Sequence, residues 1–428
     1  MKQWFVWSLI GIVVVSCGGA SAQEKTAGKF DWPQWRGPNR DGISAETGLL
    51  KRWPVDGLEL VWKTRGIGRG FSSVVVSKGK LYTMGDRDGN SDMICLDEKT
   101  GKELWATRIR SAHGNGPRST PTVDGDKVYG VGREGILGCV DAANGKLHWT
   151  VDFRGKRFKG YSMSGWDYSE SVLIDGDKLI CTPGADKAAV AALDKKTGKT
   201  IWQTQVPNCR GAGYASLVVS EGGGVRQYIT LLGNGAVGVR AKDGKLLWRY
   251  NKVTNGTANI PTPIVYKDYV LLSTAYQTGT ALLKLTPDGK GGIDAMEQYF
   301  LKGKTELQNH HGGLIRIGEY VYGGHGHNEG FPFCLHWKTG KFMWGPRPGP
   351  GRGSAAVLYA DGHFYFQYES GHMALIEANP KKRVVKSVFL LPKEFSRPRR
   401  PHPTIANGRL YVRSPNGWLL CYNVKAKS

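Results

Sequence analysis

Arginine and histidine side chains stand repeatedly just ahead of short apolar segments, where they could bind negatively charged groups. The set comprises Arg69, Arg118, Arg352, Arg399 and Arg400 with His310, His311, His402 and the aromatic Trp166. Guanidinium groups bind carboxylate and sulfate oxygens through paired hydrogen bonds. The chain also carries 59 Lys and Arg against 36 Asp and Glu, a formal net charge of +23, which favours anionic partners. We therefore predict a binding site for an anionic ligand or an acidic protein surface. The alternative is that these arginines are solvated or paired with acids on neighbouring loops.

Asp167 and Glu170 are the carboxylates nearest to these basic segments in the sequence. A carboxylate so placed could act as a general base or hold a cation, and the adjacent Trp166 could offer a stacking face. Acids at the start of a strand more often bond backbone groups or arginine. Asp167 and Glu170 are therefore the catalytic candidates, with a structural role as the alternative.

Four histidines could form a metal site. His310 and His311 open an apolar segment, and His325 and His327 lie in the turn "GGHGHNEG", which we expect on the same face. Three imidazoles within reach of one another could hold zinc or copper. Adjacent side chains of a strand point to opposite sides, so we expect only one of His310 and His311 to face the site. No spacing signature such as H-E-x-x-H accompanies them, and we expect polar loop histidines without a metal.

Two nucleotide-binding patterns are excluded by their context. The stretch "GVGREG" (130–135) matches G-x-G-x-x-G but joins two strand-like segments instead of a strand and a helix. The stretch "GKT" (198–200) lacks the upstream glycine of a phosphate-binding loop. Neither pattern indicates a nucleotide.

A repeated phrase supplies the elements that must position these side chains. The copies are "LDEKTGKELW" (96–105), "VDAANGKLHW" (140–149), "LDKKTGKTIW" (193–202) and "LHWKTGKFMW" (335–344). Asp97 can bond its own backbone in a turn, and Gly101 supplies a positive φ, while Trp105 covers the outer part of a sheet. A divergent copy at 282–300 lacks the tryptophan, whose place Tyr299 or Phe300 could take. The phrase predicts architecture and carries no chemistry.

A second signature precedes each copy and raises the count of units to eight. Its forms include "GKLYTMG" (79–85), "DKVYGVG" (126–132), "EYVYGGHG" (319–326) and "GRLYVRS" (408–414). Short alternating segments separated by Asp-Gly, Asn-Gly and Thr-Gly turns are typical of hairpins. Four strands per unit at a period of roughly 45 residues predict an all-β protein, an eight-bladed β-propeller of four-stranded antiparallel blades.

The two ends of the repeat array indicate how the ring closes. The last unit stops after a third strand, at "LLCYNVKAKS", and "LELVWKT" (58–64) has a fourth strand with nothing before it. We therefore expect the N-terminal strand to complete the C-terminal blade, which removes exposed sheet edges. Loops that enter the first strand of each blade then converge at one mouth of the central channel, and this mouth brings the basic residues together.

The chain resembles a known family at these positions. The copies "LDEKTGKELW" and "LDKKTGKTIW" are similar to the tryptophan-docking repeat of pyrroloquinoline quinone (PQQ)-type eight-bladed propellers, and "DWPQWRGPNRDGISAETGLLKRWP" (31–54) resembles the lead-in of exported bacterial members. The family includes quinoprotein dehydrogenases and the non-catalytic barrel-assembly lipoprotein of the outer membrane. The catalytic members use a vicinal disulfide, a calcium ion and an Asp base. This chain has no adjacent cysteines, no evident acidic cluster and no C-x-x-C-H pattern.

The N-terminus predicts export. Lys2 precedes the apolar run "WFVWSLIGIVVVS" (4–16), which is too short to span a bilayer and is typical of a signal peptide. Cleavage could follow Ala22 or, if Val14–Cys17 is a lipobox, precede a lipidated Cys17. We expect a signal peptide at 1–22 (or 1–16), a lead-in segment at 23–57 and the propeller at 58–428. Of the other cysteines, only Cys181 and Cys209 are candidates for a disulfide.

These observations predict an exported, non-catalytic propeller in the periplasm or cell envelope, which presents a basic mouth. We expect its partner to be an envelope protein, an anionic glycan or a small anion, with no cofactor. The alternative is a divergent PQQ-dependent oxidoreductase of alcohols or sugars, with PQQ and calcium as cofactors, since the arginines suit the three carboxylates of PQQ. Export argues against a nucleic-acid partner. We expect a monomer that contacts the membrane only through a lipid on Cys17.

Overall fold

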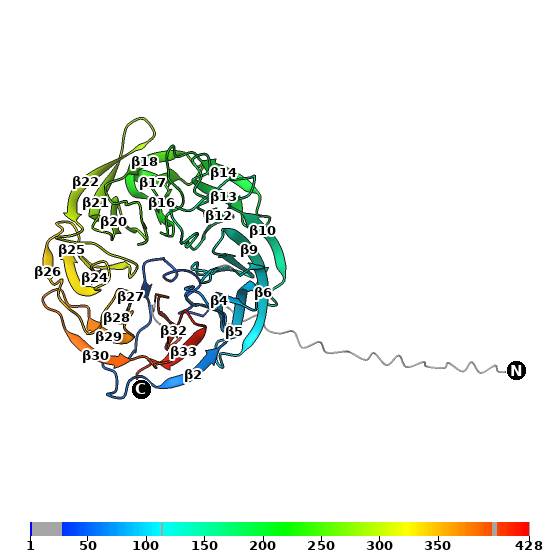
Figure 1. The fold of residues 1–428 in the computed structure, drawn as a ribbon, viewed down its shortest axis with the longest axis vertical. Coiled ribbons are helices and arrows are strands. Elements are labelled where there is room, and N and C mark those ends of the chain that lie inside the picture. The colour runs from blue at the N-terminus through cyan, green and yellow to red at the C-terminus, as the bar shows by residue number, and fades with distance from the viewer. Residues whose placement is uncertain (2–27, 113, 396–399, 428) are drawn as a thin grey trace.

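Eight β-sheets stand as blades around a central axis in the structure, a computed structural model (Figure 1). It describes residues 1, 28–112, 114–395 and 400–427. Cys17, both cleavage sites and Arg399 lie outside these residues. The predicted eight-bladed, all-β propeller is confirmed, and no helix in the described part of the chain is long and apolar enough to cross a membrane.

The first four blades follow one another along the chain, and each runs from an inner to an outer strand. Blade 1 contains β3 (Val75–Ser77), β4 (Lys80–Arg87), β5 (Asn90–Asp97) and β6 (Glu103–Ser111). Blade 2 contains β7 (Thr122–Asp124), β8 (Lys127–Val131), β9 (Ile136–Asp141) and β10 (Leu147–Asp152). Blade 3 contains β11 (Leu173–Asp175), β12 (Lys178–Cys181), β13 (Val190–Asp194) and β14 (Thr200–Thr204). Blade 4 contains β15 (Val218–Ser220), the 3-10 turn η1 (Gly222–Gly224), β16 (Gln227–Leu232), β17 (Gly235–Arg240) and β18 (Leu246–Tyr250).

The other four blades repeat this plan, with two differences at the end of the series. Blade 5 contains β19 (Ile264–Tyr266), β20 (Tyr269–Thr274), β21 (Gly279–Pro287) and β22 (Ile293–Lys302). Blade 6 contains β23 (Leu314–Ile317), β24 (Tyr320–His325), β25 (Phe331–His336) and β26 (Phe342–Trp344). Blade 7 contains β27 (Ala355–Ala360), β28 (His363–Tyr368), β29 (His372–Glu377) and β30 (Val385–Leu390), with β1 (Ile43–Ser44) added beside β27. Blade 8 contains β31 (Thr404–Ala406), β32 (Arg409–Arg413), β33 (Trp418–Asn423) and β2 (Leu60–Arg65).

Blade 8 closes the ring as the sequence predicts. Strand β2 pairs antiparallel with β33, and Trp62 lies opposite Cys421 in this ladder. The outermost strand of the last blade therefore comes from the N-terminal part of the propeller. Opening the ring would separate β2 from β33 and expose the edges of both strands.

The repeated tryptophans hold neighbouring blades together. The Trp105 ring of blade 1 lies on the turn of blade 2 at Gly145, where an added Cβ would come within 2.6 Å of the ring. The same contact joins Trp62 to Gly101, Trp149 to Gly198 and Trp202 to Gly244. Each of these glycines has a positive φ, as the turn requires. The repeated phrase therefore acts between blades, and its glycine serves both the turn and the docking of a ring.

Blade 5, whose copy of the phrase is divergent, keeps this contact with a different ring. Tyr299 lies against Gly340 of blade 6, where an added Cβ would meet its ring at 3.2 Å. Its hydroxyl donates to the Trp337 carbonyl oxygen at 2.9 Å. Tyr299 therefore takes the place of the tryptophan, one of the two replacements predicted from the sequence.

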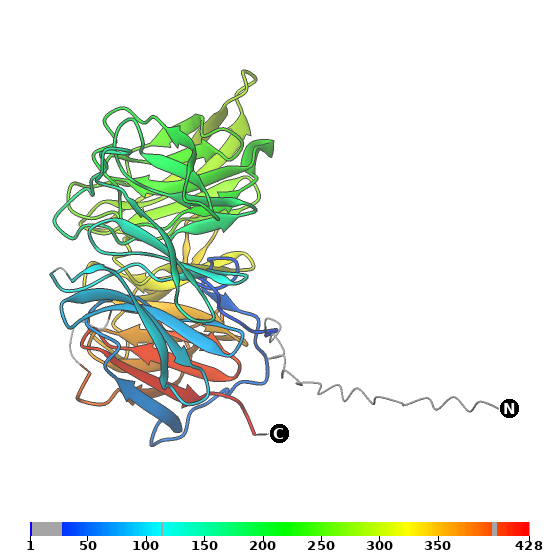
Figure 2. The ribbon, with the colours of Figure 1, turned by 90° about the vertical axis from the view of Figure 1, so that its right-hand side faces the viewer.

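The lead-in segment, residues 28–57, is not a separate extension: its first part plugs the central channel, and its last part runs outwards to β30 of blade 7, where the Trp53 amide donates to Ser387 Oγ at 2.8 Å. Figure 1 shows the dark-blue chain passing from the middle of the ring to its rim, and Figure 2 shows it along one of the two faces. Its contacts reach seven of the eight blades. They join Trp32 to Val76, Pro33 to Val123, Arg40 to Val172, Trp35 to Thr262, Arg36 to Leu314, Ile43 to Tyr359 and Leu50 to Val424. Blade 7 therefore has a fifth, parallel strand, which the four-stranded prediction missed.

The cysteines of the repeat behave as small core residues. Cys95, Cys139, Cys334 and Cys421 are buried in the sheets, as predicted. Cys181 and Cys209 are also buried and unpaired, so the candidate disulfide between them does not form.

The tryptophan contact predicts a specific difference between two glycines of blade 2. Gly145 (φ 75°) supports Trp105, whereas Gly125 (φ 61°) has nothing within 4 Å of an added Cβ. Both Gly145→Ala and Gly125→Ala should lower the free energy of unfolding by about 1 kcal/mol, because alanine is strained at a positive φ. Only Gly145→Ala adds overpacking, of about 1–3 kcal/mol. Thermal unfolding followed by circular dichroism should show the larger loss for Gly145→Ala, and equal losses would contradict the docking role.

Candidate functional site

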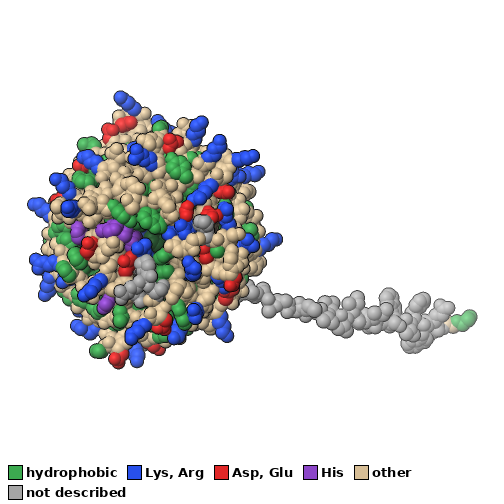
Figure 3. All heavy atoms as spheres, in the orientation of Figure 1, with side chains coloured by type: hydrophobic (Ala, Val, Ile, Leu, Met, Phe, Trp, Pro, Cys, Tyr) green, Lys and Arg blue, Asp and Glu red, His purple; other side chains and the backbone are tan. Residues whose placement is uncertain are grey.

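A hollow of about 280 Å³ opens where the loops entering the inner strands meet. Figure 3 shows the centre of this face hollowed, with histidine and basic side chains around it. Loops of blades 1 to 6 and 8 contribute to the lining, and the lead-in contributes two residues, Trp35 and Arg36. The lining includes Arg36, Arg118 and Arg400, and no Asp or Glu among the described residues. The lining therefore offers positive charge, and the acid that pairs with Arg400, Glu369, lies outside the lining.

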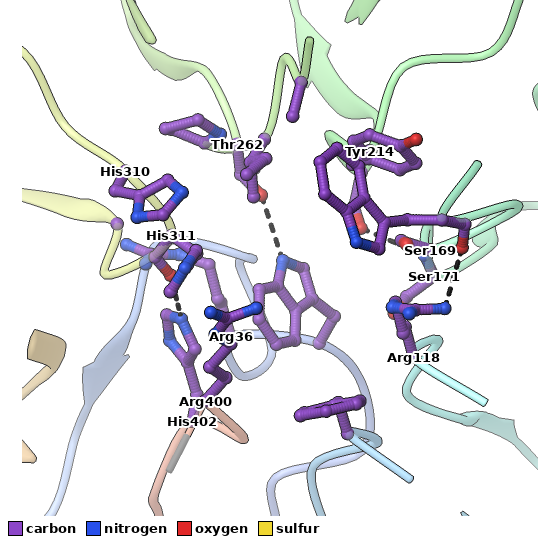
Figure 4. A pocket seen from close by; sticks show the side chains of 18 of the residues that line it. Arg36, Arg118, Ser169, Ser171, Tyr214, Thr262, His310, His311, Arg400 and His402 are labelled. Atoms are coloured by element: carbon purple, nitrogen blue, oxygen red, sulfur yellow. Dashed lines mark hydrogen bonds between the residues drawn. The ribbon is translucent and has the colours of Figure 1, made fainter. Parts of the chain in front are cut away.

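Two lead-in residues form one wall of the hollow. The Trp35 indole nitrogen donates to Thr262 Oγ1 at 2.9 Å, which fixes the ring across the channel (Figure 4). Arg36 is 5% exposed, and its Nη2 donates to the carbonyl oxygens of Asp41 and Leu314 at 2.9 and 2.6 Å. Its Nη1 lies where a side chain at Gly313 would be, 2.0 Å from an added Cβ. Glycine at 313 therefore makes room for a buried guanidinium.

A second wall combines an arginine with aromatic rings. Arg118 donates to the Trp166 carbonyl oxygen at 2.7 Å and to Asn115 Oδ1 at 2.8 Å, and its guanidinium lies 5.5 Å from the centre of the Phe71 ring. The Trp166 side chain is 41% exposed and meets the Tyr214 ring edge-on at 6.3 Å. Large exposed aromatic rings beside a cation are typical of binding sites.

Histidines form the opposite wall. The ring centres of His310 and His311 are 3.7 Å apart, and those of His310 and His327 are 4.2 Å apart, with Tyr276 against His327 at 4.3 Å. His402 Nε2 donates to the His311 carbonyl oxygen at 2.8 Å. The prediction that only one of His310 and His311 faces the site is wrong: both line the hollow, because they lie in a loop before β23 where strand alternation does not apply.

Three of these imidazoles, those of His310, His311 and His402, are neutral at physiological pH. Burial, reinforced by the nearby His327 and Arg400, lowers the pKa of His310 to about 3. Burial and the charge of Arg36 lower the pKa of His402 to about 3. Burial likewise holds the pKa of His311 well below its ordinary value. These three histidines therefore add no positive charge to the hollow.

Burial also lowers the pKa of two arginines, but both keep their positive charge. It lowers the pKa of Arg36 to about 10, and with the charge of Arg133 it lowers the pKa of Arg118 to about 10. Both side chains remain cationic at neutral pH. A ligand anion would relieve this cost, since an opposite charge favours the charged form.

Several buried nitrogens of the lining lack a hydrogen-bond partner in the described part of the chain. They are Nε and Nη1 of Arg36, Nε2 of His311 and Nδ1 of His327. Buried polar groups are nearly always paired, with protein, water or ligand. These atoms are therefore the strongest sign that the hollow is built to receive a polar molecule.

The structure brings six of the nine predicted mouth residues to this hollow and leaves two outside it. Arg118, Trp166, His310, His311, Arg400 and His402 line it. The lining excludes Arg69 and Arg352, which are exposed elsewhere on the surface. Arg399 lies outside the described residues. Arg400 is also held by Glu369, whose Oε1 accepts from Arg400 Nε at 2.9 Å.

The two acidic candidates do not face the hollow, and each has a structural partner. Asp167 pairs with Arg133, at 2.9 Å, and with Arg154. Glu170 is fully buried and accepts from the amide and hydroxyl of Thr182, and burial raises its pKa to about 7. Arginines engage Asp167, and the amide and hydroxyl of Thr182, just after β12, engage Glu170, so both acids have the structural role given above as the alternative to catalysis.

The histidines that were candidates for a metal site do not all lie at the hollow. His327 lines the hollow, but His325 does not, and its Nδ1 accepts from the Gln308 amide at 3.4 Å. Within the described ranges, no group of three or more His, Cys, Asp or Glu side chains could hold a metal. The rings of His310, His311 and His327 pack against one another face to face but tilted, with ring centres 3.7 and 4.2 Å apart and interplanar angles of 41° and 32°.

Sequence reasoning missed the contribution of the lead-in. Trp35 and Arg36 lie outside the repeat, so the argument from entry loops did not reach them. The available signal was "DWPQWRGPNRDG" (31–42), which concentrates tryptophan and arginine with glycine in a segment that matches no blade. Phe71, Tyr214 and Tyr276 were also missed, although Phe71 and Tyr214 lie in loops that enter the first strand of a blade.

The fold and the repeat define the class of protein, a PQQ-repeat propeller of eight blades. Residues 54–134 and 89–346 match the model of the family described as outer membrane protein assembly factor BamB. The chain belongs to this family.

Individual relatives fall into two groups. BamB of Burkholderia pseudomallei is 28% identical over 133 residues, which cover 29% of this chain and 31% of that protein. The quinohemoprotein alcohol dehydrogenase ADH-IIG of Pseudomonas putida is 28% identical over 161 residues, which cover 35% of this chain and 21% of that protein. The chain therefore spans about a third or less of the length of these curated relatives.

Solved structures show the same two groups. BamB of Moraxella catarrhalis aligns with a TM-score of 0.56 and 16% identity, over 87% of this chain and 99% of that chain. The alcohol dehydrogenase ADHIIG of Pseudomonas putida HK5 aligns with a TM-score of 0.60 and 14% identity, over 93% of this chain and 81% of that chain. At these identities the likeness shows the fold alone.

Neutral histidines in the hollow predict a flat titration. The C2 proton shifts of His310 and His402 should not move between pH 8 and about 5, because both pKa values lie near 3. Histidine in the unfolded chain takes up a proton near pH 6.5, whereas these two folded histidines do so only near pH 3. The free energy of unfolding is therefore highest above pH 6.5 and falls as the pH drops towards 3. Proton NMR of the assigned histidines measures this, and a midpoint between pH 6 and 7 would contradict buried neutral rings.

Proposed function

We propose that this protein is an exported, non-catalytic propeller that binds an anionic group of a ligand or partner in the hollow. The observation that carries the proposal is a lining with three arginines and, among the described residues, no carboxylate, in which Nε and Nη1 of the buried Arg36 lack a hydrogen-bond partner. An anion would supply acceptors to those donors and a negative charge beside the arginines.

The setting that we propose is the cell envelope. The apolar N-terminal run supports export, and relatives named as outer membrane protein assembly factors support an envelope location. The domain boundaries proposed are a leader ending at Ala22, or before a lipidated Cys17, then the lead-in to residue 57 and the propeller from residue 58. The partner would be an envelope protein or an anionic glycan that reaches a monomeric propeller.

The rigid ring suits such a role. Loops from seven blades meet at one mouth while the sheets behind them are packed and closed, so the binding groups are held in place before a ligand arrives. The acids that catalysis would need are engaged elsewhere, Asp167 by two arginines and Glu170 by Thr182. The arrangement supports recognition, not turnover.

Anion binding can be measured with benzene-1,3,5-tricarboxylate as the probe. Isothermal titration of the mature protein should give saturable binding. Arg118→Ala and Arg400→Ala should each raise Kd about tenfold or more, since a charge-assisted hydrogen bond contributes about 1.5–3 kcal/mol. Arg352→Ala, an exposed arginine outside the hollow, is the matched control and should leave Kd unchanged. Binding that survives the double variant Arg118→Ala/Arg400→Ala would contradict the proposal.

A second candidate function is PQQ-dependent oxidation, which the quinohemoprotein relatives keep open. Three arginines suit the three carboxylates of the quinone. Calcium, which in the resembling enzymes accompanies it, takes oxygen ligands rich in carboxylate, and the described lining offers none. The residues present therefore fit the quinone's charge and do not fit its calcium ion.

Calcium separates the two functions. If PQQ binds merely as an anion, adding calcium should leave its Kd unchanged, and ethanol or glucose should not reduce a dye acceptor in the presence of the quinone. Titration with and without calcium, followed by the dye assay, tests this expectation. Calcium-dependent tightening together with dye reduction would establish the oxidoreductase instead.

A further inference from the structure

We infer that the anionic group bound in the hollow belongs to an acidic sugar, a pyranose that carries a carboxylate or a sulfate. The inference rests on the proposed anion binding and names its ligand class. It uses three properties of the lining that a simple anion would leave unused: the imidazole nitrogens without hydrogen-bond partners, the exposed aromatic face and the limited volume.

The imidazoles indicate a ligand with hydroxyl groups. His311 Nε2 and His327 Nδ1 are buried without a hydrogen-bond partner, although Glu369 Oε1 lies 3.9 Å from His311 Nε2. His311 is neutral because burial lowers its pKa. A neutral imidazole carries one donor and one acceptor nitrogen. A hydroxyl both donates and accepts, so it satisfies either nitrogen, whereas an inorganic anion can serve only the donor.

The arginines on the other sides of the hollow would take the acidic group. Arg36 Nε and Nη1 are buried and unpartnered, and Arg118 and Arg400 also line the hollow. Arg36 lies close enough to Gly313 and to His402 that it contacts the histidine side of the hollow as well. Donors for an acid and partners for hydroxyls therefore line one small space, as Figure 4 shows for the labelled side chains.

The aromatic rings provide a face for the carbon side of a sugar ring. Trp166 is 41% exposed at the mouth although it is a large apolar side chain, and Tyr214 supports it edge-on at 6.3 Å. Exposed tryptophan next to polar groups marks a binding surface, because its apolar face gains by losing contact with water. Sulfate or acetate has no apolar face that could use it.

The volume limits the ligand to one ring. Small-molecule sites range from roughly 300 to 1,000 Å³, and the hollow, at about 280 Å³, lies at the lower end. A monosaccharide, or the last unit of a glycan whose chain leaves through the mouth, has a suitable size. A flat protein surface would leave the buried Arg36 nitrogens unreached.

The test compares probes that differ in one property each. Isothermal titration of the mature protein with D-glucuronate, D-glucose, acetate and inorganic sulfate separates the charge from the ring. D-glucuronate should bind at least about tenfold more tightly than any of the other three. Only D-glucuronate offers both a carboxylate for the arginines and a sugar ring with hydroxyl groups for Trp166 and the imidazoles. A galacturonate tetramer that binds more tightly than the galacturonate monomer would identify a glycan end, and equal affinity would identify a free sugar acid.

Two variants locate the contacts. Trp166→Ala should weaken D-glucuronate about fivefold or more and leave sulfate unchanged, whereas Arg400→Gln should weaken both. Arg400 is partly exposed and pairs with Glu369, and glutamine keeps a hydrogen-bond donor for that acid while it removes the charge. Arg352→Ala is the control and should change neither.

The outcomes distinguish this inference from the proposed function. If sulfate and acetate bind as tightly as D-glucuronate, and Arg400→Gln weakens them, the sugar inference is overturned and anion binding stands. If none of the anionic probes gives saturable heat, both are overturned. If D-glucose binds as tightly as D-glucuronate, the acidic group is not recognised and the inference fails.

Discussion

The structure depends on the way in which the lead-in segment fills the channel of the closed ring. Eight blades around one axis leave inner-strand carbonyl groups facing a central space, and buried carbonyls need donors. Arg40 donates to the carbonyl oxygens of Ser171 and Val172 in blade 3, at 2.6 and 2.9 Å, and Arg36 donates to that of Leu314 in blade 6. Two buried arginines thereby tie opposite sides of the ring to one segment. The same segment divides the channel, so the mouth becomes a closed-ended hollow and not a pore.

The lead-in segment also determines where the buried charges lie. Glu170 interacts electrostatically with Arg40 of the lead-in and accepts two hydrogen bonds from Thr182, so this acid has a structural role. Arg36 donates to two backbone carbonyl oxygens through one nitrogen, and its other two nitrogens are buried without a hydrogen-bond partner in the described part of the chain. The family to which the chain belongs includes proteins named as assembly factors, and relatives named as dehydrogenases share the fold. The described lining of the hollow contains three arginines and four histidines, and no carboxylate.

Sequence reasoning captured the periodic part of the molecule. Asp-Gly and Thr-Gly turns, strand alternation and the position of Trp62 predicted the blades and the closure, because each blade obeys local rules that repeat. The hollow was captured in part: Arg118, Arg400 and His402 line it as expected. Of the two roles that the sequence left open for Asp167, the structure has the structural one: its turn has a positive φ of 60°, and its carboxylate pairs with Arg133 and Arg154. Arg36 was missed because contacts between a non-repeated segment and distant blades leave no periodic signal.

The central claim is that an anion occupies the hollow in contact with its arginines. Crystals grown with selenate, a sulfate analogue with an anomalous scatterer, test it most directly. The account predicts an anomalous peak inside the hollow within hydrogen-bond distance of at least two of Arg36, Arg118 and Arg400. Peaks confined to exposed arginines such as Arg352, with none in the hollow, would contradict it.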